Sequence, residues 1–317
     1  MKKSMSNTGS MLIIIFLLIN ILIHPNYVSS STSLAFDIWK NNLFPFLFPM
    51  FVVSEVMISL NAIDIFSNLG NNIITKLFKV KKECTFILIM SMLSGFPSSA
   101  KYINSMYEKG ILNDNDASKI LMFAHFSNPL FIIGTISSTF LGNIKLAKLI
   151  FLSHYLTNIL IGIMFRNYNP IKKENNLSSF KYNSSTKESS KSLGAILGNA
   201  IINSINTLLL ILGTISIFLL ITTILNSTID LGNFGNAIIN GIIEMSQGLK
   251  YVSMLEISLH LKTTLSVMII SFGGLSVHLQ VMSILSNTKV KYLPFLLSRI
   301  IHALIAGLIT FLLFPIM

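Results

Sequence analysis

The sequence is poor in charge and in cysteine, and each scarcity excludes a class of protein. Only 11% of its 317 residues are charged, whereas 52% are apolar and the mean hydropathy is +0.71. One aqueous core cannot hide that much apolar surface, so the chain cannot fold as a soluble domain. The single cysteine, Cys84, excludes an internal disulfide, and no Cys or His cluster has the spacing of metal ligands.

Catalytic and nucleotide-binding motifs are also missing. There is no Gly-x-Ser-x-Gly elbow, phosphate loop, dinucleotide fingerprint or His-Glu-x-x-His pair. We therefore expect no enzyme, no cofactor and no direct use of ATP. The 23 Lys and Arg outnumber the 12 Asp and Glu, but they lie mainly between apolar segments, as in membrane proteins. Nucleic acid is therefore not an expected partner.

Long apolar runs predict an all-α integral membrane protein whose main partner is the lipid bilayer. Segments 43–60, 146–165, 201–225 and 293–315 approach or exceed the roughly 20 residues that cross a bilayer. Residues 1–35 form a separate unit, a signal peptide or an uncleaved membrane anchor, in which two lysines precede an apolar run. The oligomeric state stays open, and a homo-oligomer is compatible with the sequence.

Two halves of the chain, 36–165 and 193–317, resemble each other weakly. Lys101-Tyr102-Ile103 is echoed by Lys250-Tyr251-Val252, and Phe151-Leu152-Ser153 by Leu296-Leu297-Ser298, at offsets of about 145–150 residues. The loop after the first span is rich in lysine and its counterpart is not, which predicts an inverted-topology repeat. The basic linker 166–192 between the halves should then be cytoplasmic, which requires one of the four apolar segments in the first half to turn back.

Four interruptions in apolar segments mark the predicted solute site. We expect re-entrant hairpins at 120–141, broken at Ser127-Asn128-Pro129, and at 267–285, broken at Gly273-Gly274. A second pair of breaks lies at 94–97 and 244–248. Broken backbone inside a membrane is tolerated where it lines a wet cavity, and paired breaks in two halves point to a transporter's binding site. The alternative is that these residues form simple packing kinks.

Polar residues inside apolar segments supply the candidate ligands. Lys101 and Lys250 each follow a break, so each could bind an anion at a half-helix N-terminus or extend to a lipid headgroup. Glu244 could hold a cation or a proton, or pair with a lysine. The substrate-binding candidates are Ser98, Ser99, Lys101, Asn128, Glu244, Lys250, Ser276 and Gln280, followed by Glu55, His278, Arg299 and His302. Segment 64–82 has the pattern of an interfacial amphipathic helix.

Three strings carry a resemblance to a known family: Ser94-Gly95-Phe96-Pro97-Ser98-Ser99-Ala100-Lys101, Phe126-Ser127-Asn128-Pro129-Leu130-Phe131 and Ser271-Phe272-Gly273-Gly274-Leu275-Ser276. They resemble the YlbJ-type sporulation integral membrane proteins, and the likeness runs from about Phe36 to the C-terminus. Ser98-Ser99 departs from that pattern, where bulkier or glycine-containing residues are common.

The resemblance implies more than the residues alone. It implies a nucleoside-recognition or Gate domain, a fold like that of concentrative nucleoside transporters, and a place in the outer forespore membrane. It also implies transport of dipicolinic acid, a small organic anion, from mother cell to spore. A membrane scaffold for the spore cortex or envelope and a nucleoside transporter are the alternatives. The coupling ion and the direction of transport stay open.

Overall fold

A computed structural model describes residues 2–68, 71–169 and 192–316. These residues form helices and connections without any strand. Most of the predicted linker 166–192 falls outside them, as does the middle of the predicted amphipathic segment 64–82.

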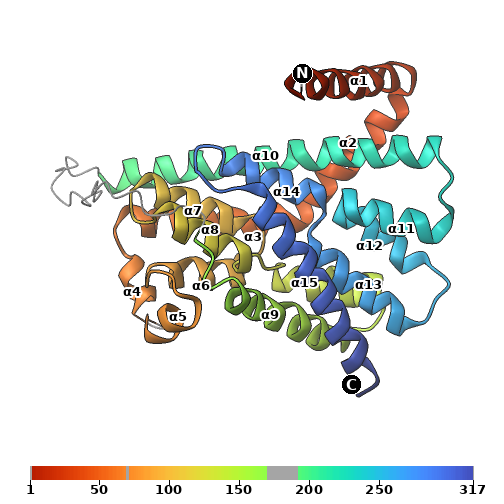
Figure 1. Cartoon of the computed structure of the whole chain (residues 1–317). Helices are drawn as coiled ribbons and strands as arrows, with labels where there is room; N and C mark the ends of the chain where they lie inside the picture. The colour runs from red at the N-terminus through yellow and green to blue at the C-terminus, as the bar shows by residue number, and fades with distance from the viewer. Residues whose placement is uncertain (1, 69–70, 170–191, 317) are drawn as a thin grey trace.

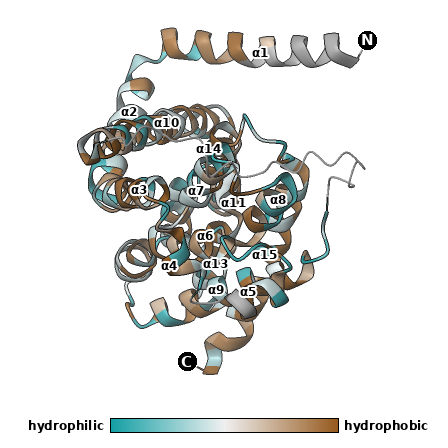
Figure 2. Ribbon diagram, turned by 90° about the vertical axis from the view of Figure 1, so that its left-hand side faces the viewer, coloured by the Kyte–Doolittle hydropathy of each residue, from teal (hydrophilic) through white to brown (hydrophobic). Residues whose placement is uncertain are grey.

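Within the described ranges, five helical segments are long and apolar enough to cross a membrane, and they include the four predicted runs. Their outward surfaces are apolar: Ile202, Leu209 and Ile217 on one helix are 57%, 51% and 50% exposed. Figure 2 shows this apolar colouring around the bundle. A protein that exposes so much aliphatic surface along such helices is suited to lipid. The five segments are 25–59, Leu146–Met164, Leu193–Thr228, Leu259–Ile284 and Tyr292–Ile316.

The first half begins with one continuous helical segment and continues with shorter helices. After the segment 25–59, two short helices lead to a helix that ends at Gly95, and the chain later reaches a π-helix and a long apolar helix. In order these elements are α2 (Pro25–Ile38), η1 (Trp39–Leu43), α3 (Phe44–Ser59), α4 (Ile63–Ser67), α5 (Asn71–Phe78), α6 (Cys84–Ser94), α7 (Ser98–Glu108), α8 (Asp114–Phe123), η2 (Phe131–Phe140) and α9 (Leu146–Met164).

The second half follows the same order, with a long helix, two interrupted pairs and a final long helix. Its longest helix lies along α2 and α3 of the first half, and its last helix packs against α9 (Figure 1). The elements are α10 (Leu193–Thr228), α11 (Gly232–Ile243), α12 (Met245–Met254), α13 (Leu259–Phe272), α14 (Gly274–Ile284), α15 (Tyr292–Leu313) and η3 (Phe314–Ile316).

The segments that turn back are not the predicted ones. α6 folds back on α7, which brings the rings of Phe86 and Tyr102 to 6.0 Å, and α11 folds back on α12, where Gly248 contacts Gly241. The predicted re-entrant pair at 120–141 and 267–285 instead forms discontinuous helices. α13 and α14 make one spanning segment, and neither this pair nor α8 with η2 packs together as α6 does with α7. The hairpin assignment was therefore wrong, although one segment of the first half does turn back.

The predicted amphipathic helix over 64–82 is also interrupted. The structure has the short helices α4 and α5, and the second ends before Lys79, which adopts a left-handed conformation with φ 54°. At the other end of the chain, α1 (Lys2–Ile23) stands apart from the bundle in both views (Figures 1 and 2).

Candidate functional site

A cavity lies where the four helix breaks meet. Its volume, counted as the space open to the centre of a water molecule, is about 50 Å³, and it is partly open to solvent. Both hairpin tips and both discontinuous helices contribute to it, and α2, η1, α3 and α10 close its side. The lining residues are Ile38, Asn42, Leu43, Leu47, Ser94, Phe96, Pro97, Ser127, Asn128, Phe131, Ile211, Ile215, Glu244, Met245, Ser246, Ser276, Val277 and Gln280.

The tip of the first hairpin packs directly on the break between α8 and η2. Gly95 has φ +82°, and a Cβ there would lie 2.5 Å from the backbone nitrogen of Asn128. Next to it, the Phe96 amide donates to the carbonyl of Phe126 at 2.7 Å. The Asn128 side chain donates to the Ser94 carbonyl at 2.9 Å, and its Oδ1 accepts from the amides at the start of η2. Only glycine fits this backbone approach.

The second hairpin repeats this arrangement with different residues. Gly274, at φ +73°, packs against Met245, and a Cβ there would lie 2.9 Å from the Met245 nitrogen. The preceding Gly273 is left-handed at φ +92° and ends α13. These two glycines let the backbone of the discontinuous helix approach the hairpin tip.

Glu244 is the one residue lining the cavity that carries an ionisable side chain. It is 2% exposed, stands at the tip of the second hairpin in extended conformation, and accepts a hydrogen bond from the Gln247 amide at 2.9 Å. It therefore caps α12, which is the usual place for a carboxylate at a helix N-terminus. Within the described residues no ion pair of Glu244 is formed.

Two serine hydroxyls in the cavity have no hydrogen-bond partner in good geometry. Ser127 and Ser276 are fully buried; the Oγ of Ser127 forms no hydrogen bond within the described part of the chain, and the Oγ of Ser276 lies near the Glu244 carboxylate without ideal hydrogen-bond geometry. Buried polar atoms are normally paired, so an unpaired hydroxyl in a cavity is available to a solute or to water. One comes from each half of the chain.

Helix N-termini also face this cavity. Pro97, Phe131, Met245 and Ser276 line it from the first turns of α7, η2, α12 and α14 or from the residue before them. Each helix N-terminus carries roughly half a positive elementary charge, so the backbone favours an anion here.

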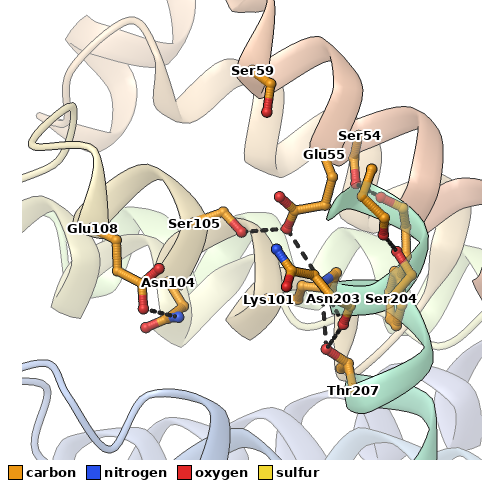
Figure 3. Close-up of polar contacts among 12 residues, drawn as sticks. Ser54, Glu55, Ser59, Lys101, Asn104, Ser105, Glu108, Asn203, Ser204 and Thr207 are labelled. Carbon is orange, nitrogen blue, oxygen red and sulfur yellow. Dashed lines mark hydrogen bonds and ion pairs between the residues drawn. The ribbon is translucent and has the colours of Figure 1, made fainter. Parts of the chain in front are cut away.

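Lys101 lies outside the cavity, in a buried ion pair with Glu55 (Figure 3). Its Nζ is 3.2 Å from Oε1 of Glu55, and the two side chains are 6% and 9% exposed. The ammonium also donates to the Asn203 carbonyl and the Thr207 hydroxyl, both at 3.3 Å, and Ser105 donates to the carboxylate at 2.5 Å. The pair therefore ties α7 to α3 and, across the halves, to α10.

The other predicted ligands divide between the cavity and its surroundings. Asn128, Glu244, Ser276 and Gln280 line the cavity together. Ser98 and Ser99 are buried beside it without lining it, and the Ser98 hydroxyl donates to the Gly95 carbonyl. Lys250 is exposed on α12, so the two lysines predicted to act together are not brought together.

Arg299 does not line the cavity. Its guanidinium instead donates hydrogen bonds to carbonyl groups at the end of α8. Fully buried on α15, its guanidinium donates to the carbonyls of Met122 and His125 and, at 3.3 Å, to Oδ1 of Asn158. Its NH1 also donates to Nδ1 of His302 at 3.0 Å. A cation at a helix C-terminus stabilises the unpaired carbonyl groups.

The two second-tier histidines bond backbone carbonyls, one within α9 and one at the break after α13. Nε2 of His302 bonds the His154 carbonyl at 3.0 Å, and Nε2 of His278 bonds the Phe272 carbonyl, at the end of α13, at 2.9 Å. Neither lines the cavity. Within the described residues no group of His, Cys, Asp or Glu could hold a metal ion.

Several lining residues were missing from the predicted site. Ser127 stood in the predicted break but was not chosen as a ligand, although its place next to Asn128 could have indicated it. Asn42 and the apolar side chains of α10 come from unbroken helices, and no local pattern distinguishes them.

Comparison with known proteins supports the resemblance predicted from the three strings. The chain is 28% identical to the sporulation integral membrane protein YlbJ of Bacillus subtilis (strain 168), over 94% of this chain and 80% of that protein. The chain is a relative of YlbJ. Together with its five apolar helical segments, this relation to YlbJ makes it a multi-pass membrane protein. No protein-family model matches the chain, and no solved structure matches it.

Proposed function

We propose that this YlbJ relative is a sporulation membrane transporter of a small organic anion, with dipicolinate as the cargo and the outer forespore membrane as the location. The observation that carries the proposal is the cavity at which four helix breaks converge. Broken helices that meet at mid-depth are typical of solute sites in secondary transporters. Dipicolinate itself comes from the family resemblance.

The order of elements supports an inverted repeat as the architecture behind this site. Each half has a long helix, a hairpin, a discontinuous helix and a final long helix, and the two hairpins enter the bundle from opposite ends (Figure 1). This is the arrangement in which concentrative nucleoside transporters, named by the resemblance, hold their solute.

The cavity's chemistry constrains how a dianion would bind. The helix N-termini, two of which are capped by Asn128 and Glu244, and the hydroxyls of Ser127 and Ser276 offer donors to carboxylates. The negative charge of the Glu244 carboxylate repels a bound anion, and neither Lys101 nor Lys250 lines the cavity to compensate that charge. A dianion would therefore enter together with a proton on Glu244 or with a cation.

Flux in proteoliposomes tests the proposal. We expect labelled dipicolinate to cross only with protein present, with a rate that depends on the pH or sodium gradient. Ser127→Ala and Ser276→Ala should each lower flux several-fold, whereas Ser253→Ala, a half-buried position on α12 outside the cavity, should not. Absence of dipicolinate flux under every gradient would overturn the proposal and favour a scaffold in cortex or envelope assembly.

A nucleoside is the second candidate, and the composition of the cavity favours it. The amides of Asn128 and Gln280 and the carboxylate of Glu244 suit the hydroxyl and amide groups of a neutral polar solute. Labelled nucleosides in the same vesicles separate the two: competition by excess dipicolinate indicates a shared site, and flux of nucleoside alone assigns the cavity to nucleosides.

A further inference from the structure

A second hollow lies on the surface where α5 meets the end of α9. Ile73, Lys76, Leu77 and Arg166 line it. Lys76 is exposed and Ile73 is 69% exposed, so two cationic and two apolar side chains share one open depression. This combination differs from the main cavity, which has one carboxylate and no cation.

The position of this hollow is that of a lipid headgroup. Arg166 follows α9 by two residues, and α9 is a 19-residue apolar helix of spanning length. The hollow therefore lies at the level where hydrocarbon gives way to the polar interface. α5 presents Ile73 to the outside there, as an interfacial helix does.

The two cations have unused capacity for an anion. Arg166 donates one hydrogen bond, from NH2 to the Lys76 carbonyl at 2.7 Å, and this bond keeps both residues at the same hollow. The Nε of Arg166 is buried without an acceptor, and neither residue has an ion-pair partner among the described residues. A guanidinium with free donors matches the geometry of a phosphate.

We propose that this hollow binds the headgroup phosphate of an anionic phospholipid, with the acyl chains against Ile73 and Leu77. The exposed apolar residues distinguish a lipid from free phosphate, which would gain nothing from them. A zwitterionic lipid carries its own cation beside the phosphate, so two protein cations attract it less. The site is independent of the solute cavity.

Native mass spectrometry of the full chain, released from detergent with equal amounts of phosphatidylglycerol and phosphatidylethanolamine, tests the proposal. We expect retained phosphatidylglycerol to exceed phosphatidylethanolamine. Each cation removed should lower retention of the anionic lipid by about fivefold, and Lys76→Ala with Arg166→Gln together by about 30-fold, as expected for juxtamembrane charges.

The same helix offers a matched control. Lys145 and Lys148 are exposed at the opposite end of α9, so Lys145→Ala with Lys148→Ala removes equal charge far from the hollow. Three results would overturn the proposal: this control loses as much lipid as the hollow variants, the unchanged protein retains both lipids equally, or excess inorganic phosphate displaces the lipid fully. Lys76→Ala alone keeps the test valid if the double variant does not fold, since its side chain is exposed.

Discussion

The buried pair between Glu55 and Lys101 permits a quantitative test of the fold, through Glu55→Gln, Lys101→Met and the double variant. Each single change leaves one uncompensated charge among side chains less than 10% exposed. Breaking a buried pair in this way costs about 3–5 kcal/mol, and the hydrogen bond from Ser105 to the carboxylate places Lys101→Met near the lower end.

The double variant should be much less destabilised than the sum of the single variants. It contains no buried charge, so it loses only the ammonium's hydrogen bonds to the Asn203 carbonyl and the Thr207 hydroxyl, each worth about 1 kcal/mol. The amide oxygen introduced by Glu55→Gln can still accept from Ser105. We expect the singles to cost about 3 kcal/mol each and the double about 2–3 kcal/mol, which gives a coupling energy of about 3 kcal/mol.

Unfolding in mixed micelles by added SDS measures these energies, with the fluorescence of the single tryptophan as the probe. Trp39 donates from its indole to the Leu208 carbonyl on α10, close along that helix to the bonds of Lys101. The surface pair of Lys82 and Asp64, whose side chains are 40% and 72% exposed, is the matched control and should couple by less than about 1 kcal/mol. The reasoning would be refuted if the losses of unfolding free energy in Glu55→Gln and Lys101→Met summed to that of the double variant within about 0.5 kcal/mol.

Three further changes test the site. Gly95→Ala should destabilise the protein by at least about 2 kcal/mol because its φ is +82° and the new Cβ would meet Asn128, whereas Gly213→Ala, in open space on α10, should be neutral or stabilising, as thermal unfolding would show. Arg299→Met should accelerate hydrogen exchange in 120–128, because it removes the donors that bond the end of α8, and unchanged exchange would contradict that role. Glu244→Gln should keep the fold and abolish the pH or sodium dependence of flux, and a retained dependence would place the coupling group elsewhere.

The long helices and the positions of the breaks could be predicted from the sequence because both depend on local composition. The apolar run 146–165 forms α9 with nearly the predicted bounds, whereas the run 201–225 lies inside the longer helix α10. The backbone is likewise interrupted at Gly95, Asn128, Glu244 and Gly273, where glycine, proline and polar residues stand in apolar surroundings.

The direction of the chain after each break could not be predicted, since it depends on tertiary contacts. Gly-Phe-Pro, Asn-Pro and Gly-Gly can each precede a bend or a reversal. Reversal at Glu244 is stabilised by the contact of Gly241 with Gly248, and the tip at Gly95 by its contact with Asn128. Gly95 and Asn128 lie far apart in the sequence, so no local pattern predicts their contact.

The repeated Lys-Tyr motif shows why residue roles are harder to predict than breaks. Lys101 and Lys250 stand at matching places in the sequence, yet one is 5% exposed and the other lies on the surface. Their difference follows from the partner helix: α7 packs against α3, which carries Glu55 forty-six positions earlier, and the second half places no acidic residue at an equivalent point.

The absence of both lysines from the cavity changes the physical account of anion binding. A lysine would attract any anion. Backbone amides at helix N-termini and the two serine hydroxyls stand at fixed positions, so they hydrogen-bond a carboxylate only if it lies at those positions. Selectivity would then depend on how far apart two carboxylates are. The carboxylate of Glu244 adds a condition on charge, because a dianion beside it needs a proton or a cation. The proposed cargo therefore implies coupled transport, and a carrier that moved dipicolinate with no proton or cation would be inconsistent with this cavity.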